Sequence, residues 1–134
     1  MHKTTTQHLI NQIYMLREFL LVGVGGALGS MARYGLSLLT SYFAIASEIG
    51  TFAANAIGSL LIGVLIAISK GDWYLLGAVG FCGGFTTFST FSAQALHLLQ
   101  SGQRTMGVIY IIASLLICIL MTWAGIALAD RFFK

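Results

Sequence analysis

One segment of the sequence combines glycines, hydroxyl side chains and phenylalanines in the middle of an apolar stretch. This segment, Gly80–Ser92, holds three glycines and a run of Ser and Thr residues, with Phe88 and Phe91 one helical turn apart. Backbone that leaves the helix at membrane depth is tolerated only where protein buries it or water reaches it. The segment therefore predicts an ion or substrate site.

Two kinds of ion fit this segment. Where the helix would break, at Gly83–Thr86, carbonyl oxygens point outward and could bind a cation without a charged side chain. A phenylalanine ring is electropositive at its edge, so Phe88 and Phe91 could pass a small anion along their edges. A cation site beside an anion path is electrostatically reasonable, because each charge offsets the cost of the other.

Further neutral polar residues lie within the apolar segments: Thr51, Asn55, Ser59, Ser114 and Thr122. Each could simply form a hydrogen bond between membrane helices, which contributes about 0.6 kcal/mol on average. Their joint presence with an interrupted third segment favours a polar path instead.

Charged side chains are almost absent from the apolar segments. Only Arg33 lies inside one, where it could pair with a neighbouring carbonyl or acid, while the carboxylates fall at segment ends or loops: Glu18, Glu48, Asp72 and Asp130. Without a carboxylate or histidine in mid-membrane, proton-coupled transport is disfavoured and acid–base catalysis has no groups to use. Cys82 and Cys118 have no partner at metal-ligand spacing and are interpreted as packing residues. We therefore expect a protein that is not an enzyme.

The composition indicates a membrane protein. Hydrophobic residues make up 57% of the 134 residues and charged residues 8%, against about 25% charged in soluble domains. The net charge of +3 is spread over termini and loops without a basic run, so no nucleic-acid partner is expected.

Four segments are long enough to cross a bilayer, which needs about 20 apolar residues. They run approximately over 19–43, 49–69, 73–99 and 106–129. The loops between them are short, so neighbouring spans are antiparallel and both termini lie on one side. We expect an all-α membrane protein with four transmembrane helices per subunit, the third of them broken.

The polar first part, residues 1–18, is predicted to be a tail outside the channel domain at 19–134. Its apolar residues recur at helical spacing and predict a short interfacial helix: Leu9, Ile10, Ile13 and Leu16. A cleavable signal peptide is not expected, because the first span is too long and three more follow.

The positive charges orient the protein only weakly. Five lie on the side of the termini, against Arg104 and Arg33 on the other: Lys3, Arg17, Lys70, Arg131 and Lys134. This bias favours cytoplasmic termini, and it is small enough to be compatible with insertion in both orientations.

Four strings together resemble a known family, the small fluoride channels called Fluc or CrcB. They are Gly25–Gly29 followed by Arg33-Tyr34, then Gly50–Gly58, then Gly80–Ser92 as the most specific, and more loosely Tyr110–Thr122. The resemblance covers nearly all of residues 19–129.

The resemblance implies an antiparallel, dual-topology homodimer in the cell membrane that exports cytoplasmic fluoride passively through two pores. Each fluoride path would draw on both subunits and be lined by Asn55, Phe88, Phe91, Thr51, Ser114 and Thr122. Backbone carbonyls of Gly83 and Thr86 from both subunits would hold one structural sodium ion, and Arg33 would act structurally or electrostatically. The chain departs from some members at Cys118, where they have serine and where a thiol donates more weakly.

Two alternatives stay open on the sequence. A small multidrug-type transporter would need a carboxylate within the first span, and Glu18 lies only at its edge. A non-conducting structural subunit would be compatible with small residues four apart, such as Gly25 and Gly29, which let helices approach closely. A transport assay separates these functions.

Overall fold

The protein is a bundle of long helices. The computed structural model describes residues 2–133, and the side chains of residues 7–133, and within these the secondary structure is entirely helical. Of the charges used above for orientation, Lys134 lies outside the described residues, and so does the side chain of Lys3.

Four stretches of helix are long and apolar enough to cross a membrane, as predicted: Gln7–Tyr42, Ser47–Ile68, Gly71–Gln100 and Arg104–Phe133. The first belongs to α1 (His2–Tyr42), the second is α2 (Ser47–Ile68) and the last is α6 (Arg104–Phe133). The third consists of α3 (Gly71–Trp73), the π-helix η1 (Tyr74–Cys82), α4 (Gly83–Phe85) and α5 (Phe88–Gln100). The all-helical, four-span architecture is therefore confirmed.

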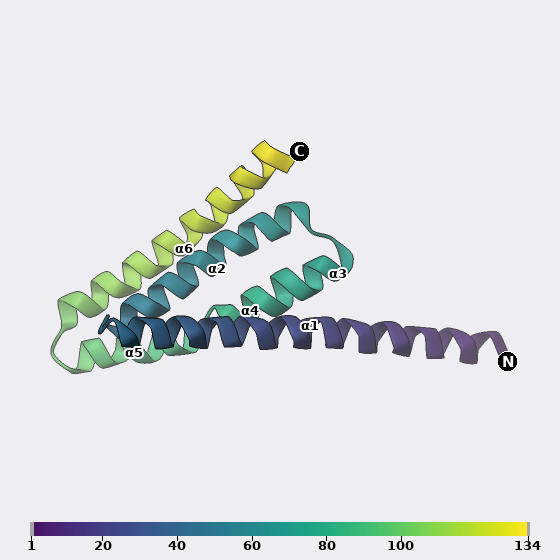
Figure 1. Cartoon of the computed structure of the whole chain (residues 1–134), viewed down its shortest axis with the longest axis horizontal. Coiled ribbons are helices and arrows are strands. Elements are labelled where there is room, and N and C mark those ends of the chain that lie inside the picture. The colour runs from purple at the N-terminus through teal and green to yellow at the C-terminus, as the bar shows by residue number, and fades with distance from the viewer. Residues whose placement is uncertain (1, 134) are drawn as a thin grey trace.

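Short connections make neighbouring spans antiparallel. Gly71, where α3 begins, has a positive φ of 56°, and Gly102, between α5 and α6, has one of 85°. Ala44, between α1 and α2, also has a positive φ, of 53°. Glycine adopts this left-handed conformation without steric cost. As a result, both ends of the described chain lie at the same end of the bundle (Figure 1).

The first and third spans pack backbone against backbone. A Cβ atom at Gly25 would collide with the Leu76 carbonyl, and one at Gly29 would collide with the Phe81 carbonyl. This close approach confirms the packing predicted for Gly25 and Gly29, and it places α1 against η1 and α4. The second and fourth spans, α2 and α6, run side by side on the other side of the bundle (Figure 1).

The α1 helix continues well beyond the rest of the bundle at its N-terminal end (Figure 1). Leu9, Ile13 and Leu16 are exposed in this extension. An ion pair between Arg17 and Asp72 joins α1 to α3 where the extension begins.

Candidate functional site

The third span is irregular at Thr86 and Thr87, which separate α4 from α5. Both have extended backbone, with φ −80° and ψ 157° at Thr86 and φ −149° and ψ 107° at Thr87. The Thr86 hydroxyl donates to the Cys82 carbonyl over 2.9 Å. The Thr87 hydroxyl accepts from the backbone N–H of Thr90 over 3.3 Å and so caps α5.

The side chain of Asn55, on α2, holds Thr87 in this conformation. Its Oδ1 accepts from the Thr87 N–H over 2.7 Å, and its Nδ2 donates to the Thr87 carbonyl over 3.2 Å. One amide therefore satisfies both backbone groups of a residue outside the helix. An amide nitrogen carries two N–H donors, so the bond to the Thr87 carbonyl uses one of them.

Because of these bonds, two carbonyls do not receive the hydrogen bonds that they would accept in a regular α-helix. In a continuous helix the Thr87 N–H would bind the Gly83 carbonyl, and the Thr90 N–H would bind the Thr86 carbonyl. The first donates to Asn55 instead, and the second donates to the Thr87 hydroxyl. Gly83 and Thr86 are the two residues whose carbonyls were predicted to bind sodium.

Arg33 reaches into the same segment from α1. Its Nε donates to the Gly84 carbonyl over 3.4 Å, and the Ser30 hydroxyl approaches that carbonyl at 3.5 Å. Of the partners that the sequence left open for Arg33, the structure therefore shows a backbone carbonyl. Arg33 and Thr51 also line a groove of about 230 Å³, together with hydroxyl and amide side chains: Ser37, Thr40, Ser41, Ser47, Thr87, Thr90 and Gln94.

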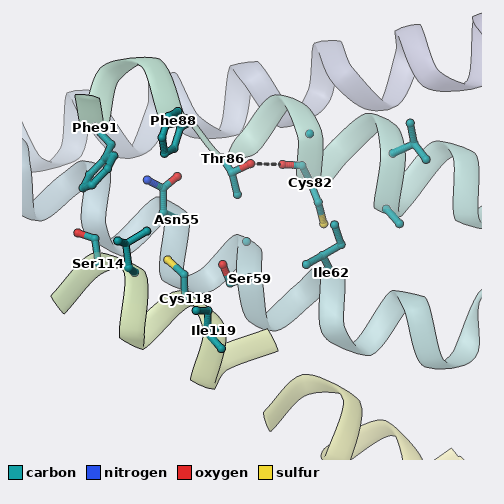
Figure 2. Close-up of a pocket in the computed structure, with 15 residues that line it drawn as sticks. Asn55, Ser59, Ile62, Cys82, Thr86, Phe88, Phe91, Ser114, Cys118 and Ile119 are labelled. Atoms are coloured by element: carbon teal, nitrogen blue, oxygen red, sulfur yellow. Dashed lines mark hydrogen bonds between the residues drawn. The ribbon is translucent and has the colours of Figure 1, made fainter. Parts of the chain in front are cut away.

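A larger cavity of about 560 Å³ lies between α2, the third span and α6 (Figure 2). It brings together most of the predicted site residues: Asn55, Gly83, Thr86, Phe88, Phe91 and Ser114. Two predicted residues lie elsewhere. Thr51 lines the smaller groove, and Thr122 donates to the Cys118 carbonyl over 3.0 Å farther along α6.

The two phenylalanines differ in their surroundings. Their ring centroids lie 5.6 Å apart at an interplanar angle of 45°. Phe91 is 7% exposed and also packs against Tyr110, whereas Phe88 is 74% exposed. Both rings lie beside Asn55, and Ser114 lies below Phe91 in this view (Figure 2).

Ser114 has a buried hydroxyl that, among the described residues, makes no hydrogen bond. The residue is 5% exposed and lines the cavity. A buried polar group without a partner costs about 1–3 kcal/mol, so each one in a native fold calls for an explanation. A polar ligand in the cavity would supply one.

Sequence reasoning missed one contact beside the larger cavity. Ser59, named among the polar residues of a possible path, and Cys118, the position where the chain departs from some family members, both line this cavity. The Tyr110 hydroxyl donates to Gln94 over 2.9 Å, next to the buried Phe91. The four-residue spacing of Tyr110, Ser114 and Cys118 on one face of a helix was the available signal.

Comparison with known proteins agrees with this architecture. A family model described as "CrcB-like protein, Camphor Resistance (CrcB)" matches residues 20–126. A protein of Gloeothece citriformis named "Fluoride-specific ion channel FluC" is 44% identical, over 85% of this chain and 98% of its own length. Proteins with the same name from Gloeobacter violaceus and Campylobacter jejuni are 45% and 40% identical, each over 83% of this chain and 94% and 96% of their own lengths.

The extent of these matches decides the assignment. The family model spans all four predicted membrane segments, from within α1 to within α6. The relatives are matched over nearly their whole lengths. This multi-pass membrane protein therefore belongs to the CrcB family.

Proposed function

We propose that this protein is a fluoride-selective channel that lets cytoplasmic fluoride leave the cell passively. The observation that carries the proposal is the near full-length match to relatives named fluoride-specific ion channels. These names describe ion channels and not enzymes, and they do not favour a multidrug-type transporter or a structural subunit.

The larger cavity supports a path for a small anion. The donors that line it include the amide of Asn55, whose second N–H is not used by Thr87, and the orphaned hydroxyl of Ser114. The edges of Phe88 and Phe91 are electropositive. Neutral donors can replace part of the water around fluoride and still release it, which conduction requires.

The smaller groove supports an entrance to this path. Arg33 is the charged residue among its lining side chains, and Thr51 lies in it with several other hydroxyls. A cation in a polar groove raises the local concentration of anions. Thr122, farther along α6, would extend the polar track beyond Ser114 and Cys118 in the other direction.

The extended segment supports a sodium site. We propose that the Gly83 and Thr86 carbonyls, whose regular helical donors bind elsewhere, hold one Na⁺ together with the same carbonyls of a second subunit. Backbone carbonyls suit a hard cation. The described part of the chain contains no group of three or more His, Cys, Asp or Glu that could hold a metal.

We propose a second subunit because the aromatic ring of Phe88, at the edge of the site, is exposed. Phe88 is 74% exposed beside the larger cavity, and a second copy would cover it and add its own residues to the path. We propose that the two copies insert in opposite orientations and that the irregular third helix meets its copy at the dimer axis.

The test is fluoride efflux from liposomes that contain the purified protein and are loaded with potassium fluoride. A fluoride electrode records release after valinomycin is added, and chloride-loaded vesicles serve as the control. Release of fluoride without release of chloride is expected. Folded protein that releases neither ion would refute the channel and favour the structural subunit, and proton-coupled exchange of organic cations would favour the multidrug-type transporter.

A further inference from the structure

A third groove lies at the end of the bundle where α2 begins, α5 ends and α6 begins, the end opposite the termini (Figure 1). Its volume is about 510 Å³. Most of its lining is apolar: Ala46, Ile49, Phe52, Leu98, Met106, Ile109 and Ala113. The remaining lining residues are Glu48, His97, Gln103 and Tyr110.

The apolar part of the groove, called the slot below, includes Met106, Ile109 and Ala113 along one stretch of α6. Ile49, Met106 and Ile109 form an exposed rim, being 57%, 60% and 55% exposed, whereas Leu98 is buried at 9%. From Met106 to Ala113 the helix rises about 10 Å, at 1.5 Å per residue. A slot of this kind fits an extended hydrocarbon chain.

Three of the polar lining residues lie near the ends of the helices that border the groove. Glu48 lies in the first turn of α2, His97 in the last turn of α5, and Gln103 just before α6 begins. The Glu48 carboxylate accepts from the hydroxyl of Ser47 over 3.3 Å, and within the described side chains it has no basic partner at ion-pair distance. A carboxylate in this position attracts a cation.

This groove faces a different direction from the proposed ion path. An α-helix turns by about 100° per residue, so Ile109 and Ala113 lie on average about 120° around α6 from Leu115 and Ile119. The last two line the larger cavity, where the second subunit is proposed to bind. The groove therefore opens at the surface of the described chain through the exposed side chains of Ile49, Met106 and Ile109, on a different face of α6 from the larger cavity.

We propose that this groove binds a membrane phospholipid whose headgroup carries a primary ammonium. The ammonium donates to the Glu48 carboxylate, His97 and Gln103 donate to the phosphate, and one acyl chain lies along Phe52 and Ile109. Hydrogen bonds between charged groups are about twice as strong as neutral ones. A choline headgroup has no N–H to donate, so the site selects against it.

Native mass spectrometry of the full-length protein with equal amounts of phosphatidylethanolamine and phosphatidylcholine tests this site. The wild type is expected to retain one phosphatidylethanolamine per subunit, with a preference of about tenfold, the ratio that one charge-assisted hydrogen bond supplies. Glu48→Gln is expected to remove the preference. Glu18→Gln makes the same change at an exposed residue of α1 and is expected to leave it intact.

A second variant separates recognition from any effect of Glu48 on the start of α2. Glu48→Lys is expected to reverse the selection, so that anionic phosphatidylglycerol is retained over phosphatidylethanolamine. Equal retention of ethanolamine and choline lipids by the wild type would overturn the proposal, as would an unchanged preference in Glu48→Gln. A disulfide between two Met106→Cys subunits would overturn it in favour of a protein interface. None of these readouts depends on fluoride flux.

Discussion

Replacing Asn55 with aspartate tests the proposed anion path at its most constrained residue. Aspartate keeps the oxygen that accepts from the Thr87 N–H, over 2.7 Å in the present structure. It loses the N–H that donates to the Thr87 carbonyl over 3.2 Å, and places a carboxylate oxygen there instead. Leaving that pair of oxygens unsatisfied costs about 1–3 kcal/mol of folding stability.

The effect on fluoride is expected to be larger. Two like charges 4 Å apart repel by about 4 kcal/mol at an effective dielectric constant of 20. At about 1.4 kcal/mol for each factor of ten, this lowers the occupancy of the path by about a thousandfold. Flux through Asn55→Asp should therefore fall to the leak of empty vesicles, although most of the protein stays folded.

The assay is the liposome efflux experiment, combined with size-exclusion chromatography and thermal unfolding of each variant. Gln100→Glu is the matched control, because it makes the same amide-to-acid change at an exposed residue at the end of α5. The control should conduct like the wild type. Folded Asn55→Asp protein whose flux stays within threefold of the wild type would refute the reasoning and leave Asn55 with a purely structural role.

Three further predictions follow from other contacts. Phe88→Ile and Phe91→Ile should each reduce fluoride flux at least tenfold with the protein still folded, and normal flux in both would exclude a path along the rings. Gly29→Ala should destabilise the protein by about 1–3 kcal/mol in thermal or denaturant unfolding, because its Cβ would meet the Phe81 carbonyl. Gly35→Ala, with nothing within 4 Å, is its control and should be neutral. Thr87→Val should cost about 1 kcal/mol through loss of the α5 cap, and unchanged stability would show that the cap contributes nothing.

The spans and their order could be predicted from the sequence because they depend on local composition. Length and apolarity define a membrane helix, and all four predicted segments are helical. Small residues four apart predicted the close packing at Gly25 and Gly29 for the same reason. The region of the site could also be located, because glycines and hydroxyls are unusual within an apolar run.

The partners within the site could not be predicted, because they depend on which helix faces meet. Asn55 and Thr87 are 32 positions apart, and nothing in either residue's neighbourhood specifies that they pair. The π-helical turns of η1 add to the difficulty, since they rotate the faces of the third span away from a regular α-helical pattern. Tyr110 was missed for a related reason, because its partner Gln94 lies on another helix.

The length of α1 has a consequence for how the protein meets its surroundings. A helix of 41 residues is about 60 Å long, twice the roughly 30 Å of a bilayer's hydrocarbon core. Part of it would therefore extend beyond the hydrocarbon core as a rod, starting near the ion pair between Arg17 and Asp72. In an antiparallel dimer, the N-terminal extensions of the two subunits would lie on opposite sides of the membrane. A protease added outside sealed vesicles could then reach a cleavage site engineered before Gln7 in only one subunit of each pair. Digestion would stop when half of the subunits had been cleaved.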